Sequence, residues 1–182
     1  MGPVEYVFLA IGVVFAFIGL ARGYSRELGN TILIMYTVAA LGLIEGRFKD
    51  NIQQVGTSIL GLSTEQATTF LALSLSLALI VMVVASYTGI TFNFGGKEVG
   101  GLAGSLISLG VGLLNGYLVA GSLWYYANLA GYPLVPVTQN FTTAAQTILA
   151  VPPTGLLPQT IFPSPFYWLI PATVLMFLRV RG

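Results

Sequence analysis

The sequence predicts an all-helical integral membrane protein with about five apolar segments. Of its 182 residues, 55% are hydrophobic and only 7% are charged, whereas soluble domains carry about 25% charged residues. The charges also leave long charge-free blocks, at residues 6–21, 28–44, 66–96 and 99–178. Blocks of this length can cross the roughly 30 Å of bilayer hydrocarbon as helices.

The blocks predict four complete spans, over residues 4–21, 26–44, 66–90 and 99–128. The fourth ends near Gly131 and Pro133, because proline removes a backbone donor and disfavours helix before it. A fifth segment, 166–178, contains Pro171 and is short, so it fits either a thin, kinked span or a re-entrant segment.

The connections predict one further helix and a proline-rich segment. Phe48, Ile52 and Val55 recur at helical spacing among charged and amide residues, which indicates a separate amphipathic helix over 48–62 in the outer interface. Ser63 or Thr64 is expected to cap the third span.

The proline-rich stretch 131–165 cannot expose bare backbone to lipid, so it lies outside the hydrocarbon or packs against protein. The chain thus divides into a four-span unit, 1–130, and an outer segment with a final helix, 131–182.

Basic residues predict the orientation, because they accumulate on the cytoplasmic side. With five spans and the N-terminus outside, the inner side receives Arg22, Arg26, Lys97, Arg179 and Arg181. The outer side receives Arg47 and Lys49. A four-span arrangement would remove this bias, so five spans, with the C-terminus cytoplasmic, are the prediction.

The fourth span carries a seam of small residues at every fourth position. Such a seam lets two helices approach closely in lipid. It serves either a partner or second copy, or packing inside the chain against the first or third span. The seam consists of Gly100, Gly104, Ser108, Gly112, Gly116 and Ala120.

Charged and amide residues offer two further features. Arg22, Arg26 and Glu27 form an inner-face charged hairpin, which could hold a partner or an anionic lipid headgroup, or could only fix topology and cap the turn. Asn115, beside the seam, is expected to hydrogen-bond to a neighbouring helix.

Residue types exclude most chemistry. The chain has no cysteine and no histidine, which removes thiolate nucleophiles, the commonest metal ligand and the usual proton shuttle. A net charge of +1 leaves no basic surface for nucleic acid. We therefore expect no enzyme activity, no cofactor and no metal. No ionisable residue falls at the centre of a span, which disfavours a proton-driven carrier.

Two stretches together resemble the bacterial colicin V production protein (CvpA) family. One is the hairpin at 19–28, GLARGYSREL, which is similar to the RGxxRE-type hairpin of that family; the other is the glycine-rich span from 100 to 116. The resemblance covers residues 4–130 and implies a small bacterial inner-membrane protein linked to export and envelope maintenance, without an established reaction. After residue 130 the chain departs from the family pattern.

Three functions remain open. The first is a non-catalytic, CvpA-like inner-membrane protein that acts through helix packing and association with other membrane proteins or itself, surrounded by membrane lipid. The second is an accessory structural subunit of a respiratory or photosynthetic complex. The third and weakest is a channel or carrier, which would need a path lined by Thr, Ser and Asn.

Overall fold

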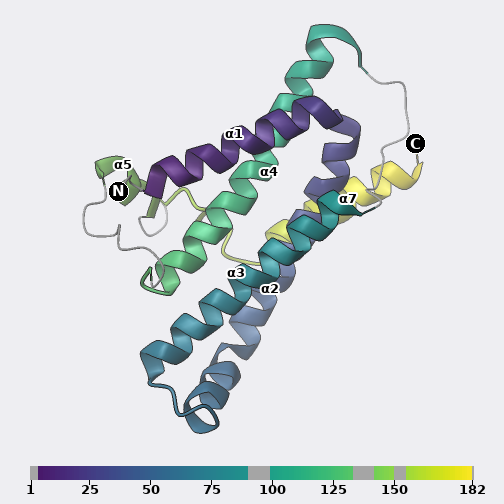
Figure 1. The fold of residues 1–182 in the computed structure, drawn as a ribbon. Coiled ribbons are helices and arrows are strands. Elements are labelled where there is room, and N and C mark those ends of the chain that lie inside the picture. The colour runs from purple at the N-terminus through teal and green to yellow at the C-terminus, as the bar shows by residue number, and fades with distance from the viewer. Residues whose placement is uncertain (1–3, 90–98, 133–141, 150–154, 182) are drawn as a thin grey trace.

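The computed structural model describes residues 4–89, 99–132, 142–149 and 155–181, and every regular element in these ranges is a helix (Figure 1). The helices are α1 (Val4–Arg22), α2 (Tyr24–Ser58), α3 (Thr64–Thr88), α4 (Gly101–Leu129), α5 (Thr143–Leu149), α6 (Pro158–Ile161) and α7 (Phe166–Arg181). Helices α1 to α4 are long and apolar enough to cross a membrane. The predicted all-helical chain with four long apolar helices is confirmed for the described residues.

A single glycine separates α1 from α2. Gly23 has a φ of +82°, a conformation that side chains with a Cβ rarely adopt. The backbone hydrogen bonds continue across it, because Gly23 N donates to Gly19 O at 2.9 Å and Glu27 N donates to Gly23 O at 3.2 Å. Glu27 consequently belongs to the first turn of α2 and not to a loop.

Helix α2 is unbroken for 35 residues, a length of about 52 Å. The prediction of a separate amphipathic helix over 48–62 was wrong, because α2 continues through this region. Its second half packs against α3 instead of lying alone: Gln53 Nε2 donates to Thr68 Oγ1 at 2.8 Å, and Gly56 lies close to Ala67.

Local backbone signals set the ends of α3 and α4. Ser63 and Gln66 form a reciprocal capping box at the start of α3, which confirms Ser63 as the expected cap. At the end of α4, Gly131 adopts a φ of +66° and Tyr132 N donates to Ala127 O at 2.9 Å. This left-handed glycine termination stops α4 where the sequence predicted.

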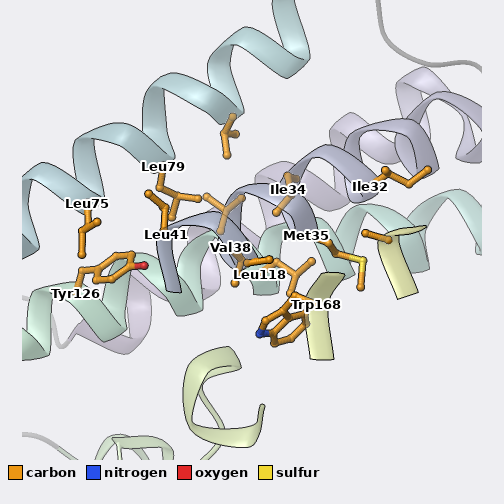
Figure 2. Close-up of a cluster of buried hydrophobic side chains, with 14 of the residues drawn as sticks. Ile32, Ile34, Met35, Val38, Leu41, Leu75, Leu79, Leu118, Tyr126 and Trp168 are labelled. Carbon is orange, nitrogen blue, oxygen red and sulfur yellow. The ribbon is translucent and has the colours of Figure 1, made fainter. Parts of the chain in front are cut away.

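Helix α4 lies at the centre of the bundle, with α1 on one side and α2 and α3 on the other (Figure 1). Its Leu118 and Tyr126 are 1% exposed and join the main hydrophobic core (Figure 2). The labelled partners in this core are Ile32, Ile34, Met35, Val38 and Leu41 of α2, Leu75 and Leu79 of α3, and Trp168 of α7.

Helix α7 has 16 residues and packs antiparallel to α2. Its start lies near Gly42, where a Cβ would come 3.2 Å from Pro165, and further along α7 Thr173 Oγ1 is 3.0 Å from Tyr36 OH. Figure 1 shows its C-terminal end on the side of the molecule where α1 turns into α2. Its first half is anchored by Trp168, which is 7% exposed.

The described part of the proline-rich stretch packs against α4. Leu157 is 1% exposed, the Leu156 carbonyl accepts a 2.6 Å hydrogen bond from Tyr117 OH, and Pro158 sits against Gly121. Packing against protein, one of the two expected placements, therefore holds for residues 155–161. Residues 133–141 and 150–154 of the same stretch lie outside the described residues.

Candidate functional site

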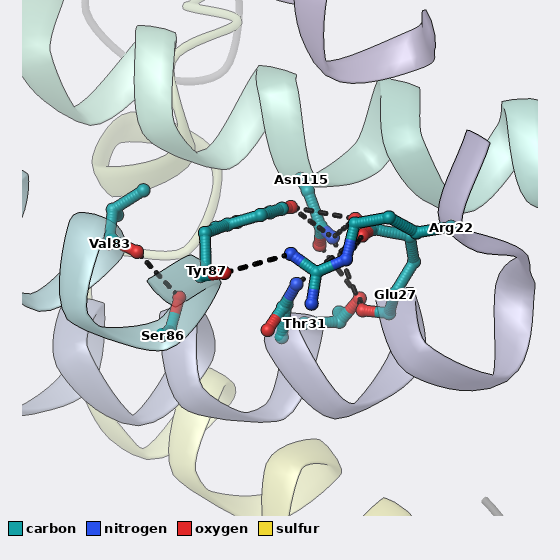
Figure 3. A network of polar contacts seen from close by, with 8 residues as sticks. Arg22, Glu27, Thr31, Val83, Ser86, Tyr87 and Asn115 are labelled. Atoms are coloured by element: carbon teal, nitrogen blue, oxygen red, sulfur yellow. Dashed lines mark hydrogen bonds and ion pairs between the residues drawn. The ribbon is translucent and has the colours of Figure 1, made fainter. Parts of the chain in front are cut away.

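The candidate site is a network of polar side chains at the place where four helices meet (Figure 3). Arg22 ends α1, Glu27 lies in the first turn of α2, Tyr87 lies in the last turn of α3, and Asn115 lies near the middle of α4. The turn at Gly23 brings the first two residues together, and the antiparallel run of α3 and α4 brings the others to the same level.

The carboxylate of Glu27 is the centre of this network and is completely buried. Its Oε1 lies 3.5 Å from Arg22 Nε and accepts a 3.3 Å hydrogen bond from Asn30 Nδ2. Its Oε2 accepts hydrogen bonds from Tyr87 OH at 2.7 Å and from Asn115 Nδ2 at 3.0 Å. Both oxygens are therefore saturated by groups of the same chain.

Asn115 connects α4 to α2 and α3. Besides Glu27, its Nδ2 donates to Tyr87 OH at 3.2 Å, and its Oδ1 lies 2.7 Å from Thr31 Oγ1, which can donate to it. The expectation that Asn115 hydrogen-bonds to a neighbouring helix is confirmed. Buried amides and hydroxyls need such partners, because an unpaired one costs about 1–3 kcal/mol.

Arg22 closes the network from the side of α1. Its guanidinium carbon lies 4.8 Å from the centre of the Tyr87 ring, and its Nη1 donates to the Tyr87 carbonyl at 3.3 Å. That carbonyl is in the last turn of α3, where the helix dipole favours a positive charge. Phe15 packs edge-on against the same ring at 5.4 Å, so Tyr87 is fixed from three directions.

The structure pairs Arg22 with Glu27 and leaves Arg26 outside this pair, although the three residues were predicted as one charged hairpin. Glu27 is buried, Arg22 is 22% exposed, and Arg26 is exposed. Because α2 begins at Tyr24, position 27 is already helical and turned toward α4. Of the three, Arg26 alone presents its side chain mainly outward.

Sequence reasoning missed that Glu27 belongs to a polar stripe. Glu27, Asn30 and Thr31 are three and four residues apart, the spacing of one helix face. All three are 1% exposed or less. That stripe, in a segment otherwise apolar, was the available signal for a buried polar contact with another helix.

The middle of the small-residue seam packs against α1. A Cβ added at Gly112 would collide with the Phe15 carbonyl and lie 3.1 Å from the Cα of Gly19. One added at Gly116 would lie 2.9 Å from the Cα of Gly12. Here the two backbones are in direct contact, which only residues without a Cβ permit.

The other seam residues have different surroundings. Ser108 and Ala120 are buried, at 5% and 3% exposed. Gly104 is buried against the Val99 carbonyl, at the start of its own helix, and Gly100 has no neighbour within 4 Å of an added Cβ. The seam is thus an internal packing surface at its centre and not one uniform face.

Comparison with family models, curated proteins and solved structures finds no match for this chain. The site must therefore be interpreted from its own chemistry. Among the described residues, no three acidic side chains gather into a group that could hold a metal ion. The carboxylate that is buried most deeply, Glu27, already has an arginine as its counter-ion.

Proposed function

We propose that this chain is a non-catalytic integral protein of the bacterial inner membrane that acts by associating with other membrane proteins or with itself. The observation that carries the proposal is the saturation of Glu27. A carboxylate within a membrane segment is by default a candidate for transport or catalysis. Here its four nearest donors come from α1, α2, α3 and α4. The carboxylate therefore joins the four helices and has no acceptor position left for a substrate.

The uncovered surface of α1 is where such an association would take place. One side of α1 packs on α4, and most of the rest is uncovered and apolar. A second copy or partner would use this surface and not the centre of the seam, which α1 already covers. The large apolar residues exposed on α1 are Tyr6, Val7, Leu9, Val13, Val14, Phe17 and Leu20.

The resemblance to the colicin V production protein family gives further support. It extends over α1 to α4, the part that forms the polar network and the α1–α4 contact. On this proposal the four helices are the common framework, and residues 131–182 are an addition, of which the described part 155–181 packs on α4 and along α2.

An accessory subunit of a respiratory or photosynthetic complex is the alternative, and a channel or carrier is the weaker one. The buried Glu27 is the observation that favours a carrier. Its saturation argues against one, since a proton or ion carrier needs an acceptor that can exchange its partner.

Purification from the native membrane distinguishes these functions. We expect the tagged full-length protein, extracted in mild detergent, to be recovered alone, as a colourless homo-oligomer, or with a few envelope proteins identified by mass spectrometry. Stoichiometric recovery with a coloured multi-subunit complex would instead establish the accessory-subunit alternative.

We further propose that the N-terminus is outside and the C-terminus cytoplasmic. Arg22, Arg26 and Arg179 lie toward one end of the bundle, and Arg47 and Lys49 lie toward the other, as the directions of α1, α2 and α7 require. Lys97 lies outside the described residues.

The absence of cysteine from the chain makes this orientation directly testable. Asp50→Cys and Arg26→Cys each place one thiol at an exposed position near opposite ends of the proposed span in α2. We expect a membrane-impermeant maleimide to label Asp50→Cys in intact spheroplasts and Arg26→Cys only after permeabilisation. The unaltered chain gives the blank, and the reverse labelling pattern would overturn the orientation.

A further inference from the structure

A polar cavity of about 330 Å³ lies where α2, α4 and the segment before α7 meet. It is formed at the point where the charge-free stretch 28–44 of α2 ends. Its Glu45 lies 18 positions after Glu27 along α2, a rise of about 27 Å that is close to the thickness of bilayer hydrocarbon. The cavity therefore falls at the opposite membrane surface from the Glu27 network, at the depth of lipid headgroups.

Two glycines of α2 leave room for the cavity. Gly42 and Gly46, one turn apart, both line it. Gly46 has no atom within 4 Å of an added Cβ, so the space beside it is open. Pro163, just before α7, completes the wall.

The lining carries one fixed acceptor that is suited to a positive group. Glu45 uses Oε1 to accept a 2.9 Å hydrogen bond from Tyr125 OH, which holds the carboxylate and leaves Oε2 for a ligand. Gln159 is held by its Nε2, which donates to Ser122 Oγ at 2.8 Å.

The same lining carries two cations and a second carboxylate. The cations are Lys49, one helical turn after Glu45, and Arg47. The second carboxylate is Asp50. The four ionisable side chains therefore balance to zero net charge. A purely anionic or purely cationic ligand would meet two like charges, whereas a zwitterion would find a partner for each of its ends.

We propose that this cavity binds an ammonium–phosphate zwitterion, the chemistry of a phosphatidylethanolamine headgroup. The primary ammonium donates hydrogen bonds to the Glu45 carboxylate, and the phosphate lies toward Lys49 and Arg47. A trimethylated ammonium cannot donate these hydrogen bonds, so a phosphatidylcholine headgroup is discriminated against. The inference goes beyond the association proposed above and does not depend on it.

The test measures which headgroup the full-length protein retains. The protein is reconstituted in nanodiscs with equal amounts of dioleoyl phosphatidylethanolamine and dioleoyl phosphatidylcholine, and co-purifying lipid is quantified by mass spectrometry after mild detergent extraction. We expect about a tenfold preference for phosphatidylethanolamine, the size that one charge-assisted hydrogen bond confers.

Three variants make the result specific. Glu45→Gln removes the charged acceptor, and Gly46→Leu places a large side chain in the cavity at a position where an added Cβ has no neighbour within 4 Å; each is expected to abolish the preference. Glu65→Gln removes an exposed carboxylate at the same end of the bundle and is expected to retain it. The thermal stability of each variant in phosphatidylcholine alone shows whether it is folded. If either Glu45→Gln or Gly46→Leu does not fold, the other one is sufficient for the test.

A free zwitterion is distinguished by adding O-phosphoethanolamine to the protein in phosphatidylcholine nanodiscs. A rise in thermal stability for the unaltered chain, absent in Glu45→Gln, shows that the site also takes the soluble form. The proposal would be overturned if all four proteins retained the two lipids in equal amounts and the unaltered chain did not respond to O-phosphoethanolamine. Retention of the preference by Glu45→Gln would overturn the assigned chemistry.

Discussion

Replacing Glu27 with alanine is expected to destabilise the folded bundle by about 3–5 kcal/mol, the cost of removing one partner from a buried ion pair. The substitution leaves the Arg22 guanidinium without its carboxylate and removes the acceptor of Tyr87 OH and one of the acceptors of Asn115 Nδ2. The measurement is unfolding in mixed micelles of dodecyl maltoside and sodium dodecyl sulfate. Trp124 and Trp168, which are 2% and 7% exposed, report it by fluorescence.

Two comparisons show whether the effect belongs to the network. Glu27→Gln keeps an acceptor oxygen but loses the charge, so its cost should fall between those of the alanine variant and the unaltered chain. Glu65→Ala, at an exposed position, should change the free energy of unfolding by less than about 0.5 kcal/mol. A similarly small effect for Glu27→Ala would show that the carboxylate does not join the four helices.

Adding one methyl group at Gly112 is expected to destabilise the bundle by about 1–3 kcal/mol, the usual cost of overpacking. The new Cβ of Gly112→Ala would meet the backbone of Phe15, Ala16 and Gly19, and backbone atoms cannot rotate away as a side chain can. The whole of α1 must therefore shift. The same micelle titration measures the loss.

Gly110 supplies a matched control two residues away on the same helix. An added Cβ there has no neighbour within 4 Å, so Gly110→Ala should be neutral or slightly stabilising, because alanine favours helix over glycine by up to about 1 kcal/mol. The effect at Gly112 should also be independent of protein concentration, since α1 of the same chain covers it. A concentration-dependent loss would show that the seam joins two copies instead.

Features that depend on nearby residues could be predicted from the sequence. The four long helices follow from charge-free blocks of sufficient length, since each block must bury its own backbone hydrogen bonds to enter lipid. The start of α3 follows from Ser63 and Gln66, and the end of α4 follows from Gly131. The signals for these two helix ends lie within about one helical turn of the end that they determine.

Features that depend on distant residues could not be predicted from the sequence. Glu27 was predicted at the surface because its partners Tyr87 and Asn115 are 60 and 88 residues away. Likewise, Gly46 and Gly56 and the change from apolar to charged residues favour a break in α2. The contacts of Gln53 and Gly56 with α3 outweigh that preference, and tertiary packing of this kind is not visible in a local pattern.

The short length of α7 has a consequence for the surrounding lipid. Its 16 residues extend only about 24 Å, about 6 Å less than the usual hydrocarbon thickness, while α2 beside it exceeds that thickness. A bilayer that α7 crosses must thin on that side of the protein, at a cost of fractions of a kcal/mol for each ångström of hydrophobic mismatch. Lipids with shorter or more disordered acyl chains reduce this cost, so in a bilayer that α7 crosses we expect such lipids to gather on this side of the molecule.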